Sequence, residues 1–224
     1  MKTRKTIRLK RMRNLKRIHK LLRPYIKNIE GIDNLPKNAA FIAISNHNSA
    51  ADTVPLHTTI GTLTNKNLCT IVRLVMSREK LLYKLVYNAL MKFCNSLTNP
   101  ISIFEGNVIN RCVQNLKKGN ILVSFPEGLM NLDTKILLEA KTGTARVALL
   151  SKVPIVPIGI LNSEKILPPP HSFIPRFHKL TIKIGKPITL RKYYGKEEDK
   201  KVLKEVTRIL MKEVGKLCNK KYPY

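Results

Sequence analysis

Short apolar runs of strand length alternate with segments of helical periodicity along most of the chain. Strands are predicted at Ala39–Ser45, Leu68–Met76, Ile101–Phe104, Ile121–Phe125, Pro154–Leu161 and Leu180–Ile184. Helices are predicted at Asp52–Ile60, Leu81–Phe93, Asn107–Lys118, Thr142–Lys152 and Asp199–Leu217. This alternation predicts an α/β fold, with a mostly parallel central sheet flanked by helices. Pro157 suggests that its strand lies at a sheet edge or ends there, because proline donates no ladder hydrogen bond.

Residues 1–27 form a segment of different character. Twelve of them are Lys or Arg, and the apolar residues recur at helical spacing between them. The positions that form the apolar face are Leu15, Ile18, Leu22 and Tyr25, broadened by Leu9, Met12, Leu21 and Ile26. The pattern predicts a basic amphipathic helix that ends near Arg23-Pro24. We expect residues 1–27 to associate with anionic membranes and 28–224 to form the main domain; the alternative is a helix packed on that domain.

The net charge narrows the choice of partners. With 42 basic and 14 acidic residues the formal charge is +28, which favours nucleic acid, anionic lipid or phosphate-bearing substrates. The basic residues are spread along the chain, aromatics make up only 6%, and no recognition motif is present, so no nucleic-acid partner is expected. By charge alone, the chain could be a non-enzymatic protein that binds nucleic acid or an anionic membrane, and this is the alternative to an enzymatic function.

Cysteine usage and hydropathy indicate the compartment. The four cysteines, at 69, 94, 112 and 218, have neither metal-finger nor disulfide-framework spacing, so we expect reduced packing residues and no metal. No apolar run approaches the ~20 residues that span a bilayer, and no signal peptide is predicted. The expected location is therefore the membrane surface, peripheral or monotopic, on the cytoplasmic face.

The stretch at 44–53 carries the candidate chemistry. His47 and Asp52 would point apart on one straight helix, but they meet if His47 ends the turn after a strand and Asp52 starts the next helix. The turn and N-cap residues between them fit such a corner. A carboxylate beside an imidazole fixes its tautomer, so His47 is a candidate general base for a hydroxyl. The alternative is a loop histidine beside a helix-capping aspartate.

Three blocks of sequence carry a family resemblance. The first is Asn46-His47-Asn48-Ser49-Ala50-Ala51-Asp52, the second is Phe125-Pro126-Glu127-Gly128, and the third is the apolar Val153–Ile158. In this order they resemble the glycerolipid (lysophospholipid) acyltransferase family, typified by 1-acylglycerol-3-phosphate acyltransferase, over about residues 29–187. The first two blocks also match the family at their other fixed positions, which are Asn46, Ser49, Phe125 and Pro126.

The resemblance implies an O-acyltransferase, with 28–224 as its acyltransferase domain. The acceptor hydroxyl would attack the thioester of acyl-CoA or acyl carrier protein directly, with His47 as base, Asp52 as its orienting partner and no cofactor. The acceptor would be a lysophospholipid and the product phosphatidate. Glu127 and Gly128 would bind the acceptor, Glu127 through acceptor hydroxyls or a cation near the phosphate, and Gly128 through its backbone N–H.

The chain departs from the family at two positions. Glu105 and Met130 stand where the family usually has arginines that grip the acceptor phosphate. Arg111, Lys141 and Arg146 are the nearby basic residues expected to replace them, and Arg146 matches a family-typical basic position. A relative with a changed acceptor is the remaining alternative.

Overall fold

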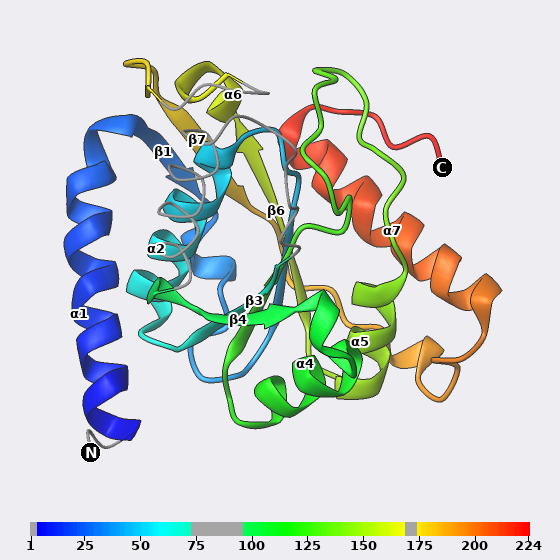
Figure 1. Cartoon of the computed structure of the whole chain (residues 1–224). Helices are drawn as coiled ribbons and strands as arrows, with labels where there is room; N and C mark the ends of the chain where they lie inside the picture. The colour runs from blue at the N-terminus through cyan, green and yellow to red at the C-terminus, as the bar shows by residue number, and fades with distance from the viewer. Residues whose placement is uncertain (1–3, 73–95, 169–173) are drawn as a thin grey trace.

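A mostly parallel sheet forms the centre of the molecule (Figure 1). The computed structural model describes residues 4–72, 96–168 and 174–224. Within them the sheet has seven strands, in the order β1-β7-β6-β2-β5-β3-β4. They are β1 (Ile26–Glu30), β2 (Ile42–Ser45), β3 (Leu68–Val72), β4 (Asn99–Ser102), β5 (Ile121–Ser124), β6 (Ile155–Leu161) and β7 (Leu180–Ile184). Only the β6–β7 pair is antiparallel, so the predicted fold class is confirmed.

Helices cover both faces of the sheet. They are α1 (Arg4–Leu22), α2 (Thr53–Thr64), α4 (Val108–Lys117), α5 (Gly143–Ser151), the short α6 (Ser163–Ile166) and α7 (Lys200–Cys218). Side chains alternate across a strand, so Ile42 and Ile44 of β2 join the core under α4, α5 and α7. Phe41 and Ala43 join the second core, under α2. The two buried cores fix the register of β2 and so the place where its carboxyl end emerges.

The direction of the strands indicates on which side of the sheet, at the carboxyl ends of the parallel strands, a functional site is expected. β2, β3, β4, β5 and β6 run the same way, so their carboxyl ends lie along one edge. Ligands of open α/β sheets gather at that edge, because the loops that leave it carry the variable side chains. The two motif blocks follow β2 and β5, which are direct neighbours.

Helix α1 packs mainly against α2 (Figure 1), and its Arg11 also donates to Asn99 of β4. Met12 and Leu15 of its predicted apolar face are buried there. Gly61 of α2 permits the close approach, since a Cβ at this position would lie 2.8 Å from Leu15 Cδ1. The structure thus shows the packed arrangement for these two residues, whereas Leu9 and Leu21 stay 62% and 74% exposed.

Several sequence predictions need correction. β6 lies between β7 and β2, so the prediction from Pro157 that this is an edge strand is wrong. Proline is tolerated because the β6–β7 ladder begins only at Ile158, beyond the Pro157 carbonyl that accepts from the Gly185 N–H. The sequence does not predict strand β1, because the irregular register at 26–28 breaks the alternation of buried and exposed residues. Ile26, which the sequence assigns to the apolar face of the helix, belongs to this strand.

Other boundaries differ less. The predicted strand at 101–104 is displaced to Asn99–Ser102, and the chain then forms a 3-10 turn at Ile103–Glu105. Asp199 is not in the last helix but caps it, accepting from the Lys201 and Val202 N–H groups. The predicted helix Leu81–Phe93 and the end of the strand at 68–76 lie outside the described residues.

Candidate active site

His47 and Asp52 meet at the corner between β2 and α2. His47 Nδ1 lies 2.9 Å from Asp52 Oδ2, and Asp52 is completely buried. The same oxygen accepts the backbone N–H groups of Asn48 at 2.6 Å and Ser49 at 2.8 Å. Because an ionised carboxylate only accepts hydrogen bonds, Nδ1 is the donor and Nε2 carries the lone pair. The His47 side chain is 20% exposed, so the imidazole reaches the surface.

The loop around His47 is held at both ends. Asn46 exchanges two hydrogen bonds with Ile160 of β6, accepting its N–H at 2.8 Å and donating to its carbonyl at 2.9 Å. Ser49 accepts from the Ala51 N–H and forms a capping box with Asp52, while its hydroxyl donates to the Leu167 carbonyl at 2.7 Å. Ser49 therefore holds the turn, and the Asn-His-x-Ser-x-x-Asp block is built as one rigid corner.

Glu127 follows β5 and grips the His47 loop from the side. Oε1 accepts the His47 N–H at 3.1 Å, and Oε2 accepts the Asn131 side-chain amide at 2.9 Å and the Leu138 N–H at 2.8 Å. Burial raises the pKa of Glu127, although these hydrogen bonds and the charge of Lys220 oppose the shift. Both oxygens are occupied by the protein itself. The expected role of Glu127 in binding acceptor hydroxyls or a cation stays a prediction, and its contacts add a link to the His47 backbone.

The rest of the second block completes the wall of the site. The Phe125 ring stacks on His47, with centroids 4.5 Å apart and an angle of 27°. The Pro126 carbonyl accepts the Lys141 N–H, and the Gly128 N–H donates to the Phe125 carbonyl within the turn. The N–H expected to donate to a ligand is thus used internally. Gly128 has φ of 72°, and the Lys141 side chain passes over it, with Cε 3.4 Å from the position of a Cβ.

The basic candidates divide by position. Lys141 is exposed, and its side chain lies beside Gly128. Arg146 instead donates to the Glu197 carbonyl at 3.2 Å and pairs with Glu198 at 3.3 Å, in the segment before α7. These contacts hold Arg146 near the start of α7, whereas the His47 loop lies near the end of that helix. Arg111 lies half-buried in α4.

Two positions of the site carry no signal in the sequence. The Asn131 N–H donates to the His47 carbonyl at 2.7 Å, and Lys220 donates to Asn48 Oδ1 at 3.0 Å. Lys220 comes from the C-terminal tail, 172 residues from Asn48, and nothing distinguishes it from the other lysines of a Lys-rich chain. Only the fold brings it to the His47 loop.

Residues 27–161 match the family model described as Acyltransferase, which is more than half of the chain. The chain belongs to this acyltransferase family. It is 33% identical to the chloroplastic 1-acyl-sn-glycerol-3-phosphate acyltransferase BAT2 of Brassica napus over 91 residues, 41% of this chain and 25% of that protein. It is 27% identical to Tafazzin of Drosophila melanogaster over 173 residues, 74% of this chain and 44% of that protein. The chain thus spans less than half the length of these two relatives.

The acyltransferase fold is also seen in a solved structure. The 1-acyl-sn-glycerophosphate (LPA) acyltransferase PlsC from Thermotoga maritima has a TM-score of 0.65 and 22% sequence identity, over 97% of this chain and 83% of that one. This match supports the α/β architecture. The order of blocks that indicated the family in the sequence is therefore carried by a fold of the same kind.

Proposed function

We propose that this protein is an O-acyltransferase that moves a fatty acyl group from a thioester to a hydroxyl of a lysophospholipid-type acceptor. The observation that carries the proposal is the His47–Asp52 pair, with Nδ1 donating to a buried carboxylate and Nε2 left as a base. Family membership supplies the reaction class. The names of two similar proteins, both acting on acylglycerol phosphates, support the acceptor class.

The proposed reaction proceeds in one displacement. His47 Nε2 accepts the proton of the acceptor hydroxyl as its oxygen attacks the thioester carbonyl carbon. The C–O bond forms, the C–S bond breaks, and the imidazolium returns its proton to the departing thiolate. Asp52 stabilises the imidazolium throughout, because its carboxylate stays ionised beside Nδ1.

Basic residues would bind both the donor and the phosphate of the acceptor. Acyl-CoA and acyl carrier protein are both polyanions, and the charge of +28 suits either. For a phosphate-bearing acceptor, with phosphatidate as the product, we propose Lys141 as the basic residue that binds the phosphate, because its side chain lies beside Gly128. Met130 lies in the loop that follows Gly128 and is 39% exposed.

The function is tested by release of free thiol from the donor. We expect purified protein to release thiol from acyl-CoA or acyl carrier protein only when an acceptor is added, faster with 1-acylglycerol-3-phosphate than with neutral monoacylglycerol. Mass spectrometry then identifies the acylated product. Release that needs no acceptor would indicate hydrolysis, and preference for the neutral acceptor would indicate a changed substrate; either result contradicts the proposal.

We infer that the protein contacts the cytoplasmic face of the membrane with the edge that carries the site. No helix among the described residues is long and apolar enough to cross a bilayer. Large apolar side chains are exposed in the loops around the site: Leu129, Met130, Leu132, Ile136, Ile174 and Phe177. Basic residues lie among them, including Lys135, Arg176 and Lys179. Since part of the apolar face of α1 is buried on α2, these loops are the better candidates for insertion, with basic α1 adding charge attraction.

The double variant Leu129→Ser/Leu132→Ser is expected to bind anionic vesicles at least about tenfold more weakly, because each leucine contributes about 1.5–3 kcal/mol when fully buried in lipid. Co-sedimentation measures the loss, and high salt should weaken binding because each basic residue near the surface contributes about 1 kcal/mol. The matched control is Ile32→Ser/Leu63→Ser, whose residues are 40% and 37% exposed near the opposite edge of the sheet. Equal binding of the two double variants would refute this orientation.

A further inference from the structure

The C-terminal tail returns to the active site after α7. Asn219 has φ of 59° and turns the chain, and its N–H donates to the Gly215 carbonyl. The tail then pairs with the loop that follows Glu127: the Lys221 N–H donates to the Lys135 carbonyl at 2.8 Å, and the Leu137 N–H to the Lys221 carbonyl at 2.9 Å. Figure 1 shows the tail beside this loop, above the end of α7.

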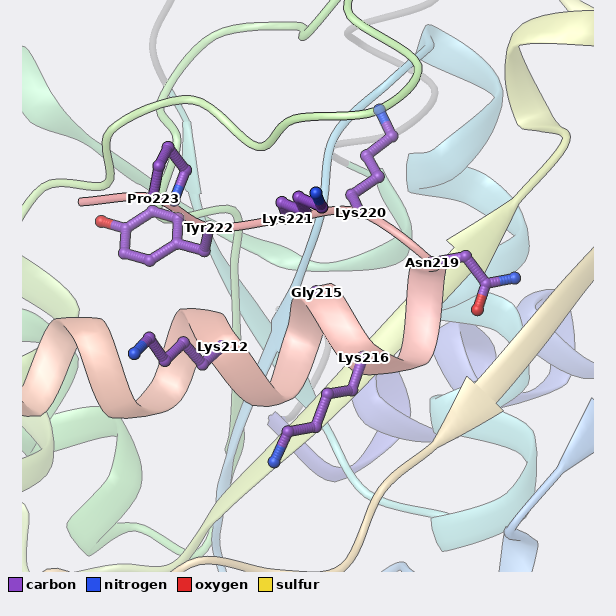
Figure 2. Close-up of a pocket in the computed structure, with 8 residues that line it drawn as sticks. All are labelled: Lys212, Gly215, Lys216, Asn219, Lys220, Lys221, Tyr222 and Pro223. Atoms are coloured by element: carbon purple, nitrogen blue, oxygen red, sulfur yellow. The ribbon is translucent and has the colours of Figure 1, made fainter.

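The side chain of Lys220 is oriented differently from those of the neighbouring lysines. Lys220 borders a groove of about 530 Å³ along the end of α7, together with Lys212, Lys216, Asn219 and Tyr222. In Figure 2 the Lys220 side chain points away from that groove, toward the loop after Glu127, whereas Lys216 points to the other side. Lys220 is only 9% exposed, although lysine side chains almost always reach water.

The Lys220 ammonium bridges two segments that hold His47. It donates to Asn48 Oδ1 at 3.0 Å and to the Asp133 carbonyl. The Asn48 N–H in turn donates to Asp52 Oδ2. On the other side, the Asp133 N–H donates to Asn131 Oδ1 at 2.9 Å, and Asn131 donates to the His47 carbonyl. Two chains of hydrogen bonds therefore run from Lys220 to His47.

The charge of Lys220 matters as well as its hydrogen bonds. No ion pair joins it to a carboxylate among residues 4–72, 96–168 and 174–224. Burial raises the pKa of Glu127, and the field of Lys220 opposes that rise. Hydrogen bonds from the Lys135 and Ile136 N–H groups lower the pKa of Asp133, and Lys220 adds to that lowering. A buried cation whose direct partners are neutral oxygens is costly, and a nearby buried carboxylate offsets part of the cost. The positive charge helps Glu127 to stay ionised and so to accept the His47 N–H.

We propose that Lys220 is a positioning residue of the active site, fastening the C-terminal tail across the Asn48 and Asp133 loops so that His47 keeps its place. This inference rests on the proposed function, for which His47 is the base. It adds a residue from the far end of the chain to the two motif blocks. The tail thereby adds a support to the His47 loop beside those from β6, the Leu167 carbonyl and the loop that follows β5.

The test compares four variants of the full chain. Lys220→Met keeps the length of the side chain and removes the charge, and it is expected to lower kcat by roughly 10- to 100-fold with little change in the acceptor KM, because a small misplacement of the base is enough. Lys220→Arg should restore part of the loss. Gly215→Ala should reproduce the loss while leaving the Lys220 side chain unchanged, since its Cβ would lie 2.5 Å from the Lys220 carbonyl oxygen and displace the tail. The control is Lys212→Met, an exposed lysine of the same groove.

Hydrogen exchange separates this inference from the proposed function. In Lys220→Met the amides of residues 47–52 and 131–137 should exchange faster, whereas those of β2, β5 and β6 keep their protection. Wild-type kcat in that variant, or a raised acceptor KM at unchanged kcat, would overturn the positioning role. If the wild-type protein transfers no acyl group, the proposed function fails, and unchanged exchange of the two loops would then overturn the role of Lys220 separately. Should Lys220→Met not fold, Lys220→Arg and Gly215→Ala carry the same comparison.

Discussion

Replacing His47 by alanine is expected to lower acyl transfer by about 100- to 10,000-fold, the usual contribution of a general base. The variant removes the group that takes the hydroxyl proton. The fold should persist, because Asp52 keeps its hydrogen bonds from the Asn48 and Ser49 N–H groups. Steady-state thiol release measures kcat, and thermal unfolding checks the fold.

The matched control for this variant is His19→Ala, which removes a half-buried histidine of α1 whose ring lies beside Thr59 of α2. It should retain wild-type turnover. Near-normal turnover in His47→Ala would exclude the proposed mechanism, since His47 is the one histidine among the described residues with a carboxylate partner.

Asp52→Asn is expected to lower kcat by up to about 10,000-fold while the acceptor KM changes little. An amide is neutral, so it no longer stabilises the imidazolium. If its NH2 group faces His47, Nδ1 must become the acceptor and the proton moves to Nε2, where it blocks the base. The second oxygen, Oδ1, is buried and has no hydrogen-bond partner among the described residues. An NH2 placed there would be an unsatisfied donor and would cost about 1–3 kcal/mol of stability.

Kinetics and urea unfolding of Asp52→Asn test both parts of this expectation. Asp33→Asn, an exposed carboxylate in the 3-10 turn after Gly31, is the control and should change neither. A variant that keeps kcat but loses acceptor affinity would show that Asp52 does not orient the base.

The helix at the N-terminus shows how far a periodic pattern leads. Its spacing predicts a helix ending near Arg23, and the structure has α1 at Arg4–Leu22. The partner of its apolar face could not be predicted, since lipid and another helix select the same side chains. Gly61 decides the matter for Leu15, because a glycine on α2 leaves room for it.

The acceptor residues show a similar limit. The sequence places Glu127 and Arg146 in the expected site, yet Glu127 faces inward to the His47 backbone and Arg146 is held by Glu197 and Glu198. A strand-end position predicts which edge a residue occupies, but the direction of its side chain depends on which donors the neighbouring loops present. Lys220 was unpredictable for the same reason, because its partners lie far away in the sequence.

The sequence by itself determined the α/β alternation, the family and the corner that joins His47 to Asp52. These depend on short-range spacing: period two in strands, helical period in helices, and a capping box within a few residues. The tertiary structure alone decided that β6 is central, that α1 rests on α2, that Glu127 accepts the His47 N–H and that the C-terminal tail reaches the His47 loop. Those contacts join segments far apart in the chain, where buried area and hydrogen-bond satisfaction, and not local pattern, select the partner.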